Sequence, residues 1–429
     1  LFKDRLRKSL QKIRDNIKNN NIPDDIFKYT LDRASKDFDY VSNSSLKRII
    51  NGTGIILNTG LGRAPISKSI LDSVSESIYP YCNLEVNIET NKRGERLSHI
   101  DPLINSLVGS EKSILVNNNA AAVMIMLNSL CKGKKVIISR GQQVEIGGSF
   151  RIPDIIKSSG CKMVEVGTTN KTHLNDYAKA IDEKTSAILY VHTSNYKVVG
   201  FTNEVDLKEL SNLCKKHKIF LLCDLGSGAI YNNNNFIPLE KEVRNYLKDG
   251  VDIVTYSGDK LLGGIQSGLI SGKNDYIKRI HKNPMYRTLR CDKYRIALLE
   301  KILRTYITTK KISNQNLSIT LFNRSIKSLN IHANKIKDSI KNKLPAHYDI
   351  QINKTNVEAG SGSLPTEKLP SIAISFSSNK ISSNKISLKL RLCSLPILSY
   401  IKDDRVFIDL KAIPDDQISE LIDMIKQCL

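Results

Sequence analysis

The stretch "DIVTYSGDKLLGG" (residues 252–264) indicates the fold and places a reactive group within it. An apolar, β-rich run leads into a polar turn in which Lys260 stands between Asp259 and several glycines. Glycines remove side-chain bulk and so leave room beside the amine for a ligand. We expect Lys260 at the carboxyl end of a buried strand, the edge at which open α/β sheets bind ligands. The alternative is a lysine that only occupies a turn.

The sequence around this stretch alternates strand-like and helical segments from about residue 50 to 285. The strand-like runs are 113–116, 135–139, 162–166, 187–191, 219–223 and 252–256, and 206–217 is one of the helical stretches between them. Such alternation predicts an α/β fold with a mostly parallel sheet covered by helices.

The remainder of the chain predicts a second, smaller unit. Long helices are expected over 291–340, and then strands at 348–352, 371–376 and 405–410 with a closing helix near 416–428. We expect an N-terminal helical segment over 1–49, a large domain over 50–300 and a small α+β domain over 301–429.

Composition is that of an ordinary globular protein with a large excess of positive charge. Of 429 residues, 65 are Lys or Arg and 43 are Asp or Glu, which gives a formal net charge of +22. This excess indicates a polyanionic partner such as nucleic acid, although a Lys-, Asn- and Ile-rich composition produces it without one. The eight scattered cysteines form no CxxC pair, and the seven histidines lie far apart. We therefore expect reduced thiols, no metal site and a cytoplasmic location, and see no apolar run long enough to span a bilayer.

The first helix is amphipathic and basic. Leu6, Leu10, Ile13 and Ile17 fall at helical spacing, and lysines and arginines fill the other faces. The basic face could contact a phosphate backbone, or it could simply be solvated.

Two further strand ends carry polar groups. The run "LLCDLGSG" places Asp224 at the end of an apolar strand, and "ILVNNNAAAV" ends a strand and opens a helix at Asn118, Asn119 and Ala120. A helix N-terminus with free N–H groups and small side chains is an anion cradle. Taken singly, the aspartate could be a helix cap and the asparagines a loop.

An amine, a carboxylate and a phosphate cradle at neighbouring strand ends together meet the needs of pyridoxal 5′-phosphate. Lys260 would form the Schiff base, and Asp224 would keep the pyridine nitrogen protonated so that the ring can accept electrons. Asn118, Asn119 and Ala120 would receive the phosphate, to which Ser257 could add a hydroxyl.

Several longer motifs resemble those of one family. They are "NNNAAAV", "SRGQQVEIGGSFRIPDI", "EVGTTNKTH", "VHTSNYKVVGFT", "DLGSG", "SGDKLLGG" and "GSGSLP". Together they are similar to the motifs of the bacterial selenocysteine synthases, the L-seryl-tRNA(Sec) selenium transferases, which have the fold-type I pyridoxal-phosphate architecture. The resemblance runs from about residue 50 to the carboxyl terminus.

The resemblance implies roles for further charged residues. "GLGRAP" supplies Arg63, and "RTLRCDK" supplies Arg287 and Arg290, which match functional arginines of the family. Two guanidinium groups three residues apart on a helix share a face and can hold a tetrahedral oxyanion, although such pairs are also common as surface ion pairs. Asp259 matches the acidic neighbour of the cofactor lysine and could influence its protonation, or could only form a turn hydrogen bond.

One more histidine is a candidate cofactor contact, and three positions depart from the family pattern. His192 in "VHTSN" could stack on the cofactor ring or could be a packed strand-end residue. Asn58, Gly60 and Gln142 replace residues usual in the family, which bears on substrate positioning more than on the type of reaction. The segment before residue 50 is short for the family's tRNA-binding domain.

The resemblance implies conversion of L-seryl-tRNA(Sec) to L-selenocysteinyl-tRNA(Sec) through a cofactor-bound aminoacrylyl intermediate, with selenophosphate as the selenium donor. The arginines would hold the selenophosphate oxygens, because the esterified α-carboxyl of the substrate is not a free anion. It also implies a homo-oligomer built of dimers, up to a decamer, in which Arg63 could serve a neighbour's cofactor. Two alternatives remain: a fold-type I lyase acting on a small amino acid or amino sugar, and a non-catalytic tRNA-binding protein.

Overall fold

The computed structural model describes residues 2–19, 24–146, 150–193, 196, 198–230, 240–308, 315–360 and 363–429. Parts of three motifs quoted above, at 147–149, 194–195 with 197, and 361–362, lie outside these residues.

The centre of the molecule is a seven-stranded sheet within the described residues. Its order is β4 (Lys112–Val116), β12 (Gly268–Gly272), β11 (Ile253–Ser257), β10 (Phe220–Gly226), β9 (Thr185–Val191), β5 (Lys135–Ser139) and β8 (Lys162–Val166). All neighbours pair in parallel except β12, which runs antiparallel to both β11 and β4. The prediction of a mostly parallel α/β sheet is confirmed.

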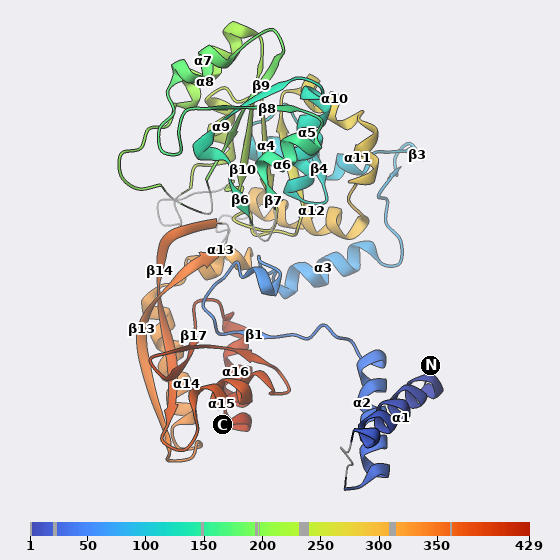
Figure 1. The fold of residues 1–429 in the computed structure, drawn as a ribbon, viewed down its shortest axis with the longest axis vertical. Helices are drawn as coiled ribbons and strands as arrows, with labels where there is room; N and C mark the ends of the chain where they lie inside the picture. Colours follow the sequence, from blue (N-terminus) through green and yellow to red (C-terminus); the bar gives the residue numbers. More distant parts are fainter. Residues whose placement is uncertain are drawn as a thin grey trace.

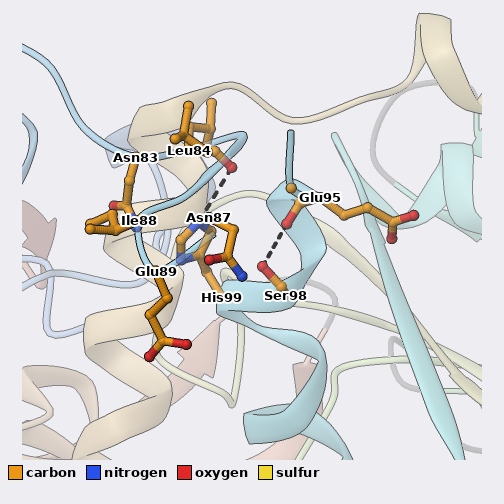
Figure 2. A pocket seen from close by; sticks show the side chains of 10 residues that line it. Asn83, Leu84, Asn87, Ile88, Glu89, Glu95, Ser98 and His99 are labelled. Carbon is orange, nitrogen blue, oxygen red and sulfur yellow. Dashed lines mark hydrogen bonds between the residues drawn. The ribbon is translucent and has the colours of Figure 1, made fainter. Parts of the chain in front are cut away.

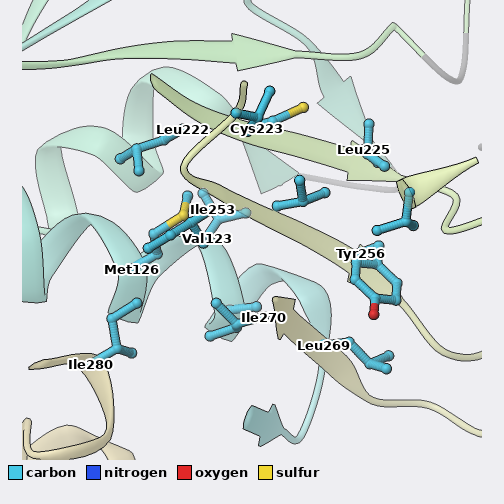
Figure 3. Packing of buried hydrophobic residues seen from close by; sticks show 14 of the residues in the cluster. Val123, Met126, Leu222, Cys223, Leu225, Ile253, Tyr256, Leu269, Ile270 and Ile280 are labelled. Carbon is cyan, nitrogen blue, oxygen red and sulfur yellow. The ribbon is translucent and has the colours of Figure 1, made fainter. Parts of the chain in front are cut away.

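Most of these strands form where the sequence is largely apolar, because helices bury both faces of such a sheet, whereas the edge strand β8 is partly exposed. Every residue of β9 is buried. Figure 3 shows Val123 and Met126 of the helix α5 (Asn119–Cys131) beside Ile253 of β11, in the middle of the main hydrophobic core. Helix α5 is apolar around most of its circumference because it lies between the sheet and two further helices, α6 and α10.

The other helices and strands include those expected from the sequence and several short elements that it did not indicate. The helices are α1 (Phe2–Lys18), α2 (Ile26–Ser42), α3 (Lys68–Ile78), α4 (Asp101–Val108), α6 (Ile152–Ser158), α7 (Leu174–Ala180), α8 (Leu207–His217), α9 (Val243–Lys248), α10 (Asn274–His281), α11 (Pro284–Thr288), α12 (Lys293–Thr308), α13 (Leu317–Phe322), α14 (Ile326–Ile340), α15 (Ser383–Arg391) and α16 (Ile418–Cys428), and the short 3-10 helices are η1 (Thr59–Leu61), η2 (Arg96–His99), η3 (Arg140–Gln142) and η5 (Asp415–Gln417). The remaining strands are β1 (Ile50–Asn51), β2 (Val86–Asn87), β3 (Lys92–Arg93), β6 (Glu145–Ile146), β7 (Phe150–Arg151), β13 (Tyr348–Gly360), β14 (Ser363–Ser378), β15 (Ile397–Leu398), β16 (Tyr400–Lys402) and β17 (Arg405–Asp409).

The carboxyl-terminal part has its own four-stranded antiparallel sheet, in the order β13, β14, β17 and β16, with a separate core that α14, α15 and α16 cover. Strands β13 and β14 pair in antiparallel along most of their length, up to the pair of Gly360 with Ser363, and so form one long hairpin. The short strand β1 pairs in parallel with β15, which ties residue 50 to this part of the molecule. The expected division into domains at residues 49 and 300 stays a prediction.

The amino-terminal helices α1 and α2 pack against each other, with Ile13 and Ala34 buried between them. Figure 1 shows this pair standing apart from the two sheets. Among the residues described, none of the helices combines the length and the apolar character needed to cross a membrane.

The structure corrects one expectation about the cysteines. Cys393 and Cys428 form a disulfide, whereas the sequence led us to expect all eight thiols to be reduced. The pairing brings the last residues of α16 against the segment after α15, a long-range proximity that cysteine spacing alone does not reveal.

Candidate active site at the carboxyl edge of the sheet

Lys260 lies in the tight turn that follows β11, as predicted, and only 4% of it is exposed. The turn needs glycine at Gly258, where an added Cβ would lie 2.2 Å from Ser267 Oγ. Burial lowers the pKa of the Lys260 amine, and the positive charge of Arg63 lowers it further. A buried lysine with a lowered pKa is typical of lysines that react with carbonyl groups.

Asp224 lies near the end of the neighbouring strand β10 and is 2% exposed. Its Oδ1 accepts hydrogen bonds from Asn119 Nδ2 at 2.7 Å, Thr255 Oγ1 at 3.1 Å and the Gly226 N–H at 3.2 Å. Burial raises the pKa of this carboxyl, while these donors and the Lys260 charge act in the opposite direction. The structure therefore brings together the amine and carboxylate that the sequence singled out.

The start of α5 faces the same edge of the sheet. Asn118 caps the helix by accepting from the Ala121 N–H at 2.8 Å, and its own carbonyl accepts from the Ala122 N–H. The Asn119 and Ala120 amides have no hydrogen-bond partner in the described part of the chain and so can receive an anion. The Asn119 side chain is engaged with Asp224, so only its backbone amide fits the predicted phosphate role.

Close packing holds this helix start in place. A Cβ at Gly268 of β12 would lie 2.1 Å from the Asn118 carbonyl oxygen, which leaves space only for glycine. Ser257, the last residue of β11, pairs with Gly268 and is buried at the same edge.

Arg63 and Asp259 form an ion pair beside Lys260. Arg63 Nη1 donates to Asp259 Oδ2 at 2.7 Å, and Asp259 is 5% exposed. Arg63 has φ of +66°, a left-handed conformation uncommon outside glycine, and its N–H donates to the Asn58 carbonyl. Asn58 also caps the short helix η1 by accepting from the Gly60 N–H at 3.0 Å. Asn58 and Gly60, two of the three residues that depart from the family pattern, thus shape the loop that carries Arg63.

Arg287 and Arg290 do not share a helical face, which corrects the prediction. Helix α11 ends at Thr288 with Leu289 as its cap, so Arg290 follows the helix. The Leu289 carbonyl accepts from the Asn117 N–H at 3.0 Å, which holds this segment beside the start of α5.

Arg290 instead belongs to a cluster of charges around Glu85. Glu85 accepts from Arg96 at 2.6 Å and from Arg93 at 3.2 Å, and Arg290 Nη1 lies 3.4 Å from it. The hydrogen bond from Arg96 holds the pKa of Glu85 below its usual range. Arg287 is exposed on α11.

A carboxylate that sequence reasoning missed, Glu240, lies beside His192, whose backbone N–H donates to the Asp224 carbonyl. His192 Nε2 is 3.0 Å from Glu240 Oε1, and Ser227 Oγ donates to the same oxygen at 2.6 Å. No local motif points to Glu240, because only the fold brings it to the strand edge. Thr255 was also missed, although it is opposite Asp224 in the register of β10 and β11.

A hollow of about 580 Å³ lies elsewhere, along the segment that carries β2, β3 and η2. Figure 2 shows His99 reaching the Leu84 carbonyl and Ser98 reaching that of Glu95 inside it. It contains none of the groups described above, so we place the active site by its chemistry and not by the size of a cavity.

The groups at the sheet edge fit pyridoxal 5′-phosphate. They supply an amine of lowered pKa, a buried carboxylate, and two backbone amides at a helix N-terminus. The buried Oδ1 of Asn119 and Nε of Arg63 have no hydrogen-bond partner in the described residues, which leaves polar atoms for a bound group.

Comparisons with known proteins agree with this chemistry. Residues 49–414 match the family model of SelA, described as L-seryl-tRNA selenium transferase. The chain is 39% identical to the L-seryl-tRNA(Sec) selenium transferase of Clostridium botulinum (strain Okra / Type B1), over 100% of this chain and 93% of that protein. It is 42% identical to the enzyme of that name from Alkaliphilus oremlandii (strain OhILAs), over 88% and 81%.

A solved structure also resembles the fold. That of a D-glucosaminate-6-phosphate ammonia-lyase aligns with a TM-score of 0.62, over 89% of this chain and 96% of that one, at 18% identity. At this identity the likeness concerns the fold alone.

Proposed function

Since the chain belongs to the L-seryl-tRNA selenium transferase family, we propose that it converts L-seryl-tRNA(Sec) to L-selenocysteinyl-tRNA(Sec) with selenophosphate as selenium donor. The observation that carries the proposal is the buried pair of Lys260 and Asp224 at one strand edge, in a chain similar to these enzymes over its whole length.

Pyridoxal 5′-phosphate is the cofactor, and Lys260, Asp224 and the amides of Asn119 and Ala120 would hold it, with Ser257 beside the phosphate. When bound, it withdraws electrons from the Cα of the attached amino acid. Lys260 has a lowered pKa, so more of its amine is neutral and able to accept the Cα proton than in an exposed lysine at the same pH. Asp224, with three donors on Oδ1, would keep the ring nitrogen protonated.

Arg63, Arg287 and Arg290 would bind the oxygens of selenophosphate. The α-carboxyl of the substrate is esterified to tRNA and therefore needs no arginine of its own. Arg63 is held beside Lys260 by Asp259, which supports its place at the reacting atoms. Arg290 neighbours the start of α5, and the exposed side chain of Arg287 would complete a site in a second copy of the chain.

The assembly is proposed to be a dimer or a larger ring of dimers in the cytoplasm. Tyr79, Tyr81 and Ile88 support an interface, because these large apolar side chains are 82%, 89% and 73% exposed on one segment. The net charge of +22 supports binding of a large polyanion such as tRNA.

The decisive experiment incubates the purified protein with seryl-tRNA(Sec) and selenophosphate. We expect selenocysteinyl-tRNA from the wild type and from Lys282→Ala, an exposed-lysine control, and none from Lys260→Ala. Equal turnover of free serine would favour a small-molecule lyase instead. Failure of borohydride to label the peptide that contains Lys260 would favour a non-catalytic RNA-binding protein.

A further inference from the structure

Buried Glu240 and Ser227 and the partly exposed His192 form a polar group that the proposed function leaves unused. The Glu240 carboxylate accepts from Ser227 Oγ at 2.6 Å and lies 3.0 Å from His192 Nε2. Glu240 is 6% exposed and Ser227 is 1% exposed. Burying a carboxylate costs free energy unless hydrogen-bond donors satisfy it, so the donors around Glu240 stabilise one defined arrangement of these side chains.

The group is tied to both strand ends that carry the chemistry. His192 directly follows β9, and its N–H donates to the Asp224 carbonyl at 2.9 Å. The Ser227 carbonyl accepts from the Leu261 N–H at 3.2 Å, next to Lys260 in the chain. The Glu240 charge also acts on Lys260, whose pKa it raises slightly against the larger lowering by burial.

The geometry leaves one side of the imidazole available. Nε2 faces Glu240, so Nδ1 is not engaged by that carboxylate. The His192 side chain is 28% exposed, which allows exchange of protons with solvent. Asp224, Lys260 and the ion pair of Arg63 with Asp259 are the other charged groups described at this edge of the sheet.

The reaction needs an acid at this place. Hydroxide is a poor leaving group, so the β-hydroxyl of serine must receive a proton as the Cβ–O bond breaks. Lys260 has just accepted the Cα proton, and a second group allows both transfers to proceed without moving one proton between two sites.

We propose that His192 is the acid that protonates the departing β-hydroxyl, and that Glu240 is a positioning residue that holds its imidazole. The inference rests on the proposed function. The Cα proton goes to Lys260, the Cβ–O bond breaks, and the hydroxyl takes the imidazolium proton and leaves as water. The electrons of the Cα–H bond form a Cα=Cβ bond, and neutral His192 regains its proton from solvent.

The first test separates the two proton transfers in His192→Gln. Exchange of the seryl Cα hydrogen with deuterated solvent should continue near the wild-type rate, whereas loss of the hydroxyl should slow by roughly 10²- to 10⁴-fold. A β-chloroalanyl-tRNA substrate should restore elimination, because chloride leaves without a proton. Equal losses in both steps, or no rescue by chloride, would show that His192 only binds or stacks.

The second test reads the placement of the His192 imidazole directly, without turnover. Diethyl pyrocarbonate modifies imidazole nitrogen, and peptide mapping gives the rate at which His192 is modified in the holoenzyme. Glu240→Gln should raise this rate, because the imidazole loses the carboxylate that holds its Nε2, and Glu240→Asp should restore it, while Glu209→Gln on the exposed face of α8 should leave it unchanged. An unchanged rate in Glu240→Gln would contradict the positioning role.

Two controls make every result decisive. Ser227→Ala keeps the imidazole and removes one hydrogen-bond donor to Glu240. It should slow loss of the β-hydroxyl less than His192→Gln does, while exchange of the Cα hydrogen continues near the wild-type rate. This variant tests the proposal even if His192→Gln fails to fold. A wild-type protein that neither exchanges the Cα hydrogen nor forms selenocysteinyl-tRNA would overturn the proposed function. A wild type that converts the substrate while His192→Gln and Ser227→Ala match it would overturn this inference alone.

Discussion

At the scale of single residues, the site depends on opposite shifts of two buried groups. Burial lowers the pKa of the Lys260 amine and raises that of the Asp224 carboxyl, because a low dielectric disfavours both charged forms. Each charge also partly stabilises the other. The lowered pKa makes the neutral Lys260 amine easier to reach, which is what a group that must accept a proton requires.

Asp224→Asn should retain the fold and the covalent cofactor but lose most of its activity. The amide cannot keep the ring nitrogen protonated, and we expect the turnover number to fall by roughly 10²- to 10⁴-fold. Asp252→Asn is the matched control, since Asp252 is also a buried aspartate but lies before β11 and pairs with Lys273. The cofactor absorbance and turnover of both variants would be measured, and equal turnover losses would argue against the assigned role.

Arg63→Gln should shift the ionisation of Lys260 upward. The Arg63 charge lowers the Lys260 pKa, so its removal should raise that pKa. The substitution also releases the Asp259 carboxylate, whose negative charge raises the Lys260 pKa as well. Less neutral amine would then be present at a given pH. Labelling of Lys260 in the cofactor-free protein by pyridoxal and borohydride, measured over a pH series, should have a higher midpoint in Arg63→Gln and a nearly normal one in Arg63→Lys. A lower midpoint in Arg63→Gln would contradict this account.

At the scale of elements, the site depends on how closely α5 approaches β12. We expect Gly268→Ala to destabilise the protein by about 1–3 kcal/mol, since the new methyl group must displace the Asn118 carbonyl. Cofactor affinity should fall as the anion cradle moves. Gly94→Ala is the control, because its Cβ would meet no atom closer than 3.4 Å. Thermal unfolding and cofactor titration measure both effects, and a Gly268→Ala protein with wild-type affinity would remove α5 from the cofactor site.

Sequence patterns predicted six of the seven strands described in the main sheet closely, because those strands are mostly apolar, but they missed β12 (Gly268–Gly272), in which glycines and a serine interrupt the apolar run. They predicted much less of the carboxyl-terminal hairpin. The strands expected at 348–352 and 371–376 are longer in the structure, where they are β13 (Tyr348–Gly360) and β14 (Ser363–Ser378). The positions of β13 from Asn353 to Asn356 are polar and exposed or half-buried, so they carry no apolar signal. Lys260 and Asp224 could be found from strand ends, whereas Glu240 could not, because its contact with His192 spans 48 residues and depends on the finished fold.

At the scale of the whole molecule, positive charge and shape point to a large substrate. The helices α1 and α2 stand apart from both sheets (Figure 1), and Ser9 and Ile13 are the α1 positions buried against α2. This packing turns Lys8 and Lys12 outward on one exposed face. Part of the excess positive charge therefore lies on α1, which projects from the rest of the molecule and can reach a partner.

The affinity for seryl-tRNA(Sec) should fall steeply with salt, because each neutralised phosphate releases condensed counterions. If six or more phosphates are contacted, the affinity should fall by about 10³-fold or more between about 50 and 200 mM monovalent salt. Lys8→Glu with Lys12→Glu should weaken binding and reduce the slope of log affinity against log salt by about one for each phosphate that is no longer neutralised. Lys385→Glu with Lys389→Glu, on exposed positions of α15, reproduces the same change of net charge away from α1. An equal reduction of the slope in both pairs would mean that the tRNA responds to overall charge, and α1 would then be no specific binding element.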